Sequence, residues 1–315
     1  MSDNEGDPVD SGSPAALIGQ AWAAVCPDDP GSPRRPASVE VVGTWGLLPS
    51  RFAVEEVAVA SVGAALLAAA ALSEQRGGGA GPVGLDRGHV ADAVRSERLF
   101  RIDGQPAGAG FAPLSRFWAA QDGWVRTHAN YPWHREALVS ALGTSAEIGA
   151  VATSVAGLPA EEVERRVFEA GGIAAAVRTS GEWEVHPQGL AVAAEPLIGY
   201  RLIGGGPARQ RPPADLPMAG VRVLDLTRVI AGPVCTRLLA ALGAEVLRLD
   251  PRSRPDMAVG AVADSLLGKT SAFLDLDSRD GVAVLHRLLD RADVVVCGYR
   301  PGALDRFGLD EEALT

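Results

Sequence analysis

The sequence contains a single lysine, Lys269, against 28 arginines, and 39 acidic residues outnumber the basic ones to give a net charge of −10. This balance argues against non-specific binding to nucleic acid, which depends on a basic surface. It does not exclude an anionic small ligand, because a local cluster of arginines can override the net charge. Since arginine is used almost everywhere else, we expect Lys269 to occupy a position that arginine cannot fill.

Cysteine is also scarce. The three cysteines, Cys26, Cys235 and Cys297, lie far apart and without Cys-x-x-Cys spacing. This pattern argues against a disulfide framework and against a zinc site. It is typical of reduced thiols, so the sequence predicts a cytoplasmic protein.

Long apolar runs are rare as well. The stretch at residues 57–72 is only 16 residues long and is dominated by alanine. We therefore interpret it as a buried helix rather than a membrane span, and expect no membrane association. The acidic start "MSDNEGDPVD" lacks the features of a signal peptide.

Composition divides the first two thirds of the chain into three parts. Residues 1–40 are rich in Pro, Ser, Gly and Asp and predict a mobile tail, with one short helix around "AALIGQAWAAV". Residues 41–203 alternate apolar helices with short strands, including a hairpin around the Asp-Gly pair at 122–123, and predict an α+β region. Residues 204–217 form a linker rich in Pro and Gly, which marks the predicted domain boundary.

The remaining residues, 218–315, follow a regular pattern that predicts a Rossmann-like parallel sheet, so the fold class is α/β. The first strand, "VRVLDL", is an almost continuous apolar run, which is typical of a buried parallel strand. Strands and helices then alternate, with strands at 221–226, 245–250, 271–276 and 293–299 and helices at 231–244 and 278–292. A sheet that stops after four strands leaves an edge uncovered, so we expect this half to be incomplete.

Two nucleotide-binding motifs are excluded by their spacing. Gly268-Lys269-Thr270 matches the end of a P-loop, but Ala263 stands where the first glycine is needed, and a strand rather than a helix follows. A dinucleotide fingerprint needs three glycines in the first strand–helix turn, and that turn holds one, Gly232.

Two histidines, His128 and His134, stand six residues apart in "RTHANYPWHR". A metal site would favour a spacing of four residues on a helix, or a third ligand, and the sequence offers neither. We interpret them as loop histidines that pack on Tyr131 and Trp133, and we predict no metal site.

Arginines gather where the predicted strands end. Ligands of open α/β sheets bind at the carboxyl ends of the strands, and guanidinium groups beside helix N-termini suit phosphate. The sequence therefore predicts a phosphate-bearing ligand at this edge. The arginines concerned are Arg228, Arg252, Arg254, Arg300 and Arg306.

Three stretches in order, "VRVLDLTRVIAGPVCTRLLAALGAEVLRLDP", "GKTSAFLDL" and "ADVVVCGYRPGALDRFGL", resemble class III CoA-transferases of the CaiB/BaiF type. That family includes formyl-CoA transferase, carnitine CoA-transferase and α-methylacyl-CoA racemase. Thr270 departs from the family's "N-K-R-S" stretch, which has an arginine after the lysine. The resemblance implies a set of contacts with CoA: Arg228, Val229, Ile230, Ala231, Arg252, Lys269, Tyr299 and Arg306.

The first half resembles the same family out of order. "DGWVRTHANYPWHREALVSALG" and "EAGGIAAAVRTSGEWEVHPQG" are similar to its small domain, which normally follows the Rossmann half. The chain thus looks like a longer, two-part variant. The family's aspartate nucleophile would lie beyond Thr315, so we expect a chain truncated at its C-terminus, and the catalytic residue is not assigned.

The resemblance implies an enzyme that moves CoA from an acyl-CoA to a carboxylic acid through an aspartyl anhydride. Coenzyme A would be a substrate, with no covalently bound cofactor, and family members form homodimers. Two alternatives stay open: an α-methylacyl-CoA racemase or dehydratase-type relative, and a non-catalytic CoA-binding remnant. The acyl group and the acceptor cannot be inferred from the sequence.

Overall fold

The computed structural model describes residues 13–26, 39–78, 82–107, 110–204, 211–256 and 259–310. The chain forms two compact units. One, here called the sheet unit, combines residues 1–108 with 200–315, and the other, the hairpin unit, comprises residues 109–199.

This grouping differs from the predicted division. Residues 41–203 were expected to form one region, but the structure assigns 41–108 to the sheet unit. Most of the predicted tail, and residues 205–210 of the predicted linker, lie outside the described residues. That each predicted region folds as an independent domain stays a prediction.

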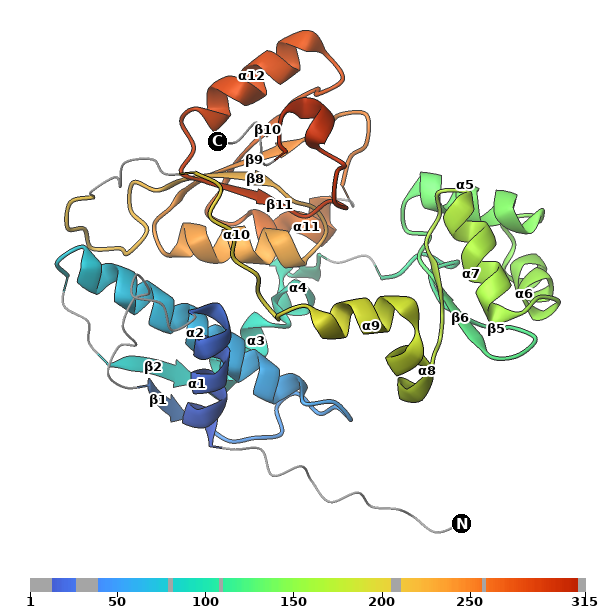
Figure 1. Cartoon of the computed structure of the whole chain (residues 1–315), viewed down its shortest axis with the longest axis horizontal. Coiled ribbons are helices and arrows are strands. Elements are labelled where there is room, and N and C mark those ends of the chain that lie inside the picture. The colour runs from blue at the N-terminus through green and yellow to red at the C-terminus, as the bar shows by residue number, and fades with distance from the viewer. Residues whose placement is uncertain are drawn as a thin grey trace. The chain divides into compact units, whose positions relative to one another are not determined.

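The sheet unit is built on four parallel strands in the order β10-β9-β8-β11. Figure 1 shows α10 and α11 on one face of this sheet and α12 on the other. The predicted parallel sheet is therefore confirmed. Its elements are β8 (Arg222–Leu226), α10 (Ala231–Ala241), β9 (Glu245–Asp250), α11 (Val259–Leu266), β10 (Thr270–Phe273), α12 (Arg279–Leu289), β11 (Val294–Cys297) and a 3₁₀ turn at Asp305–Phe307.

Both faces of the sheet are apolar because helices cover both. Val223 and Val246 belong to a cluster on one face, whereas Leu224, Leu226 and Leu285 belong to a cluster on the other. Strand β8 is buried from its second residue to its last, which explains why these residues, apart from one aspartate, are apolar.

The N-terminal part of the sheet unit packs two helices against each other. Ile18 of α1 is fully buried against α2, and a Cβ on Gly63 would come within 2.6 Å of the Ile18 side chain, so glycine permits this close approach. The elements are α1 (Pro14–Val25), β1 (Val39–Val42), α2 (Val54–Gln75), β2 (Val83–Asp86), α3 (Arg87–Ala93), α4 (Ser96–Leu99), β3 (Arg101–Ile102) and β4 (Gln105–Pro106). Strands β1 and β2 are parallel.

Helix α2 contains the apolar stretch interpreted as a buried helix. By length and composition it could cross a membrane, and it is the one helix among the described residues that could. One side of α2 packs in the core, where Val59 and Leu67 are fully buried in a cluster shared with α1 and β2, and a third of its apolar window is buried.

Arg76, directly after α2, ties this helix to the segment that leads into the sheet. Its side chain is buried and donates to the carbonyls of Pro212 (2.8 and 3.1 Å), Pro217 (2.8 Å) and Ala219 (3.0 Å). Replacing Arg76 with alanine is expected to lower the free energy of unfolding by about 2–3 kcal/mol, since three main-chain carbonyls would lose a charged donor whose side chain is buried. Urea denaturation followed by circular dichroism measures the effect. Arg51→Ala, an exposed arginine near the start of α2, serves as the control.

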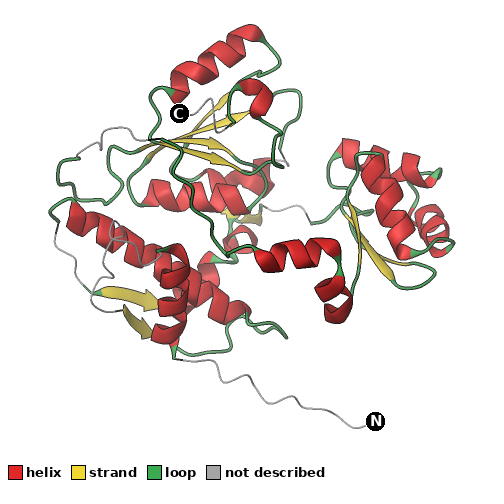
Figure 2. Ribbon diagram, in the orientation of Figure 1, coloured by secondary structure: helices red, strands yellow, loops and turns green. Residues whose placement is uncertain are grey.

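The hairpin unit consists of an antiparallel sheet with helices on one face (Figure 2). The predicted hairpin is confirmed, because Phe117 pairs with Arg126 and Ala119 with Trp124. The bounds are β5 (Phe117–Ala119), β6 (Trp124–Thr127), α5 (Pro132–Leu142), α6 (Ile148–Ala156), α7 (Ala160–Glu169), β7 (Ala174–Ala176), α8 (Ser180–Val185) and α9 (Pro187–Ala194).

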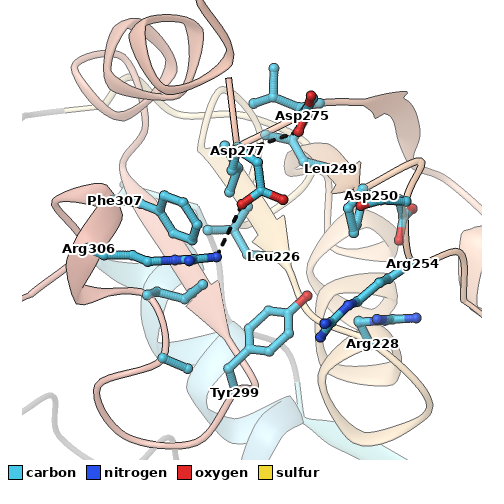
Figure 3. Close-up of a pocket in the computed structure, with 16 residues that line it drawn as sticks. Leu226, Arg228, Leu249, Asp250, Arg254, Asp275, Asp277, Tyr299, Arg306 and Phe307 are labelled. Carbon is cyan, nitrogen blue, oxygen red and sulfur yellow. Dashed lines mark hydrogen bonds and ion pairs between the residues drawn. The ribbon is translucent and has the colours of Figure 1, made fainter. Parts of the chain in front are cut away.

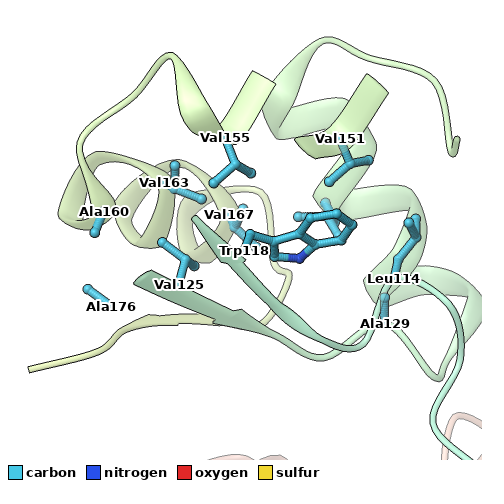
Figure 4. Packing of buried hydrophobic residues seen from close by; sticks show 11 residues of the cluster. Leu114, Trp118, Val125, Ala129, Val151, Val155, Ala160, Val163, Val167 and Ala176 are labelled. Atoms are coloured by element: carbon cyan, nitrogen blue, oxygen red, sulfur yellow. The ribbon is translucent and has the colours of Figure 1, made fainter. Parts of the chain in front are cut away.

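The core of the hairpin unit lies between this sheet and α5, α6 and α7. Trp118 and Val125 point from the strands toward Val151, Val155 and Val163 of the helices (Figure 4). Alternate residues of the strands face outward, as the period of a half-buried strand requires.

Candidate functional site

A cavity of about 310 Å³ lies at the carboxyl ends of the parallel strands. Leu226 and Asp250 are the last residues of β8 and β9, Leu274 directly follows β10, and Tyr299 follows β11. This is the edge at which the sequence predicted a ligand. Figure 3 shows Tyr299 and the charged side chains facing this space.

Charges of both signs line the cavity. Arg306 pairs with Asp277 at 3.2 Å, and both of these side chains are largely exposed. Burial raises the pKa of Tyr299, so its hydroxyl stays protonated at neutral pH and can donate a hydrogen bond. The charged lining residues are Arg228, Arg254, Arg306, Asp250, Asp275 and Asp277.

The turn between β8 and α10 carries a strained residue. Val229 has a φ of +70°, a conformation that a β-branched residue rarely adopts. Its N–H donates to Oδ2 of Asp256 at 3.2 Å. Beside it, Nη2 of Arg228 donates to the carbonyl of Pro255 at 2.8 Å and lies 3.9 Å from Oδ1 of Asp256.

Asp256 is held in turn by a buried arginine. The side chain of Arg248 is 1% exposed and that of Asp256 is 5% exposed, and they are joined at 2.8 Å. Arg248 also donates twice to Asp250, at 2.9 Å each. Burial acts to lower the pKa of Arg248, but the hydrogen bonds that it donates to its two carboxylate partners, together with their charges, outweigh burial and the net shift is upward. The guanidinium thus stays charged.

Lys269, predicted to contact a CoA phosphate, is not among the residues that line the cavity. Its side chain is fully buried, and its ammonium donates to Oδ2 of Asp225 (3.0 Å), the carbonyl of Pro233 (2.8 Å) and Oγ1 of Thr236 (2.6 Å). An ammonium has three N–H donors, and all three are used. No donor remains for a phosphate in this arrangement.

Asp225, the partner of Lys269, is fully buried and accepts four hydrogen bonds. Besides those from Lys269 and Thr236, its Oδ1 accepts from the N–H (2.9 Å) and the hydroxyl (2.5 Å) of Thr227. Burial acts to raise the pKa of Asp225, but these hydrogen bonds outweigh it, and the pKa lies below its ordinary value. Burial lowers the pKa of Lys269. The network fixes the end of β8 against the first turn of α10.

The structure gathers only part of the predicted contacts at the cavity. Arg228, Tyr299 and Arg306 line it, and so does Arg254 of the arginine cluster. The guanidinium of Arg252 lies instead over the ring of Phe273, 4.5 Å from its centroid. The remaining predicted residues are not among those that line the cavity: Val229, Ile230, Ala231 and Arg300.

Sequence reasoning missed the segment after β10. Leu274 to Asp277 line the cavity, but residues 271–276 were interpreted as strand, whereas β10 ends at Phe273. The apolar alternation of "AFLDL" continues past the last paired residue, so the sequence extended the strand too far. The position of this segment at a carboxyl end was the signal that could have found it.

The two histidines of the hairpin unit lie beside Tyr131 and Trp133 as predicted, but His134 belongs to helix α5 and not to a loop. Their rings lie 5.9 Å apart between centroids, and the rings of Tyr131 and Trp133 lie 5.5 and 5.8 Å from that of His134. Burial, and then the charge of Arg126, lower the pKa of His128. Within the described residues, no group of three or more His, Cys, Asp or Glu side chains could hold a metal ion.

Residues 218–315 match the family described as CoA-transferase family III. An acyl-CoA transferase of Gibberella moniliformis is 33% identical over 161 residues, which cover 49% of this chain and 28% of that protein. A formyl-CoA:oxalate CoA-transferase of Afipia carboxidovorans is 39% identical over 104 residues, which cover 30% of this chain and 24% of that protein.

Among solved structures, a CAIB/BAIF family protein from Brucella suis is 28% identical, with a TM-score of 0.28 over 32% of this chain and 30% of that one. The matched stretches thus span less than a third of the length of each of these similar proteins.

Proposed function

We propose that the cavity at the carboxyl ends of the strands binds the CoA part of an acyl-CoA, since residues 218–315, which contain it, match CoA-transferase family III. The observation that carries the proposal is the meeting of Arg228, Tyr299 and Arg306, from two separate stretches of sequence, around one cavity. At about 310 Å³, the cavity is at the small end of the range for ligand sites, about 300–1,000 Å³. It suits one portion of CoA, such as its nucleotide or diphosphate.

The lining residues supply what a nucleotide diphosphate needs. Arginines present planar forks of donors to phosphate oxygens. Leu226 and Leu249 offer apolar surface to a base, and the protonated hydroxyl of Tyr299 can donate a hydrogen bond. Carboxylates also line the cavity, so the arginines rather than a net positive field would select the anion.

The proposed reaction is transfer of CoA between an acyl-CoA and a carboxylate, as the names of the similar proteins suggest for this chain. A carboxylate oxygen attacks the thioester carbonyl carbon, the C–S bond breaks, and CoA leaves as a thiolate while an acyl–aspartyl anhydride forms. CoA must stay bound through this exchange, which is the role we give the cavity. The attacking aspartate is not assigned to a described residue, and a homodimer and a cytoplasmic location stay predictions.

Two measurements test the proposal. Calorimetric titration of the full chain with CoA should show binding, and no binding would contradict the proposal. Incubation with formyl-CoA and oxalate, followed by mass spectrometry, should show oxalyl-CoA. Binding without transfer would leave the CoA site in place and exclude formyl-CoA and oxalate as the donor and acceptor pair.

Arg228 gives a sharper test of the site. Replacing it with alanine is expected to raise the dissociation constant of CoA by about tenfold, the effect of losing one charge-assisted hydrogen bond. Arg222→Ala is the matched control, because Arg222 begins the strand that Arg228 follows and lies far from the cavity lining. Equal affinities of the two variants would place CoA elsewhere.

A further inference from the structure

We propose that Asp256 is a positioning residue for the CoA site, which it serves by holding the turn at Val229 in its left-handed conformation. The inference rests on the proposed function. Asp256 does not line the cavity and its side chain is 5% exposed, so it would act through the turn rather than by touching the ligand.

The backbone of Val229 is strained. A φ of +70° is unfavourable for a valine, whose branched Cβ crowds the backbone, and such residues persist only where the surrounding structure holds them. Val229 is 38% exposed, so packing of its side chain does not supply the whole restraint. The hydrogen bond from its N–H to Asp256 is the restraint that the structure shows.

The turn also carries a residue of the cavity. Arg228 immediately precedes Val229, lines the cavity, and has its guanidinium fixed by the carbonyl of Pro255, the neighbour of Asp256. A change of φ at Val229 would alter the path of the chain between β8 and α10. The carboxylate of Asp256 therefore holds the residue next to a cavity arginine.

The carboxylate of Asp256 is itself held in place. Asp256 is fixed by Nη2 of the buried guanidinium of Arg248, and Nη2 and Nε of that guanidinium also donate to Asp250. Two residues before Val229, the buried pair of Asp225 and Lys269 fixes Thr227. Two buried ion pairs thus restrain residues of the same turn.

The test combines loss of the restraint with relief of the strain. Asp256→Ala is expected to raise the dissociation constant of CoA by about fivefold to tenfold, because the strained turn must be re-formed on binding. Val229→Gly removes the penalty on φ. Added to Asp256→Ala, it is expected to restore the dissociation constant to within about threefold of the wild-type value, and by itself to change it less than threefold.

Asp293→Ala is the matched control. Asp293 also accepts a backbone N–H, that of Arg222 at 2.9 Å, and pairs with an arginine, Arg211 at 2.6 Å, but at the other end of β8. It should lower the melting temperature and leave the affinity for CoA unchanged. If Asp256→Ala does not fold, Asp256→Asn with and without Val229→Gly takes its place, with an expected loss of about threefold that glycine reverses.

The outcomes separate the two proposals. If the wild-type chain binds CoA and Asp256→Ala binds it equally well, the positioning role is wrong and the CoA site stands. If affinity falls but glycine at 229 does not restore it, Asp256 does not act through the turn, and the inference is again wrong. If the wild-type chain binds no CoA, the proposed function fails and this inference fails with it.

Discussion

Replacing Lys269 with alanine is expected to lower the free energy of unfolding of the sheet unit by about 3–5 kcal/mol. The substitution leaves the carboxylate of Asp225 fully buried without its countercharge and removes the donor to Pro233 and Thr236. Lys269→Arg should also be destabilising, by about 1–3 kcal/mol, because a planar guanidinium is too large for a space filled by a compact ammonium. Urea denaturation followed by circular dichroism measures both effects.

Two further variants test whether an unpaired buried charge causes that loss of stability. Combining Lys269→Met with Asp225→Asn should cost less than the sum of the single changes, because neither variant side chain then carries an unpaired charge. Arg306→Ala is the matched control, since it breaks a pair whose side chains are each 70% exposed and should change stability by less than about 0.5 kcal/mol. A Lys269→Ala protein that unfolds at the wild-type urea concentration would show that the ammonium is not buried with Asp225.

Lys269 shows that a linear motif does not reveal a partner that is distant in the sequence. The scarcity of lysine indicated a position that arginine cannot fill, and the three acceptors around a compact ammonium agree with that expectation. The resemblance then suggested a phosphate as the partner. The actual partner, Asp225, is 44 positions earlier in the chain, and the two meet beside α10, where Lys269 also donates to Pro233 and Thr236.

Part of the cavity lining was predictable, because the topology of a parallel sheet determines which strand ends lie together. Arg228 and Arg306 each follow a strand that the sequence identifies, and parallel strands bring their carboxyl ends to one edge, whereas Tyr299 was predicted only from the family resemblance. Arg248 and Asp256 were not predictable in this way. In sequence, Arg248 interrupts an apolar strand and Asp256 belongs to a polar loop, and both types of residue are usually exposed.

The grouping of the chain was missed for a related reason. Residues 41–108 join the sheet unit, and contacts such as those of Arg76 with main-chain carbonyls contribute to this. A carbonyl acceptor is available at every residue, so it leaves no pattern of residue types to recognise. Helix α11 was missed because it is short and lies beside a Pro- and Arg-rich stretch that reads as loop.

Trp118→Ala is expected to lower the stability of the hairpin unit by about 3–5 kcal/mol. The indole is 4% exposed within the core, and its N–H donates to Oγ1 of Thr127 at 2.8 Å. Trp118→Phe should cost less, about 1–3 kcal/mol, because most of the apolar volume stays. Urea denaturation followed by circular dichroism measures the loss, and hydrogen exchange of β6 peptides assigns it to this unit.

The matched control for Trp118 is Trp124→Ala in the same hairpin. Trp124 is 54% exposed on the outer face, so its loss should cost less than about 1 kcal/mol. The cavity is lined only by residues between 226 and 307, so both variants should bind CoA with the wild-type dissociation constant. A Trp118→Ala protein with intact stability but weakened CoA binding would contradict both the packing of the hairpin unit and the assignment of the site to the sheet unit.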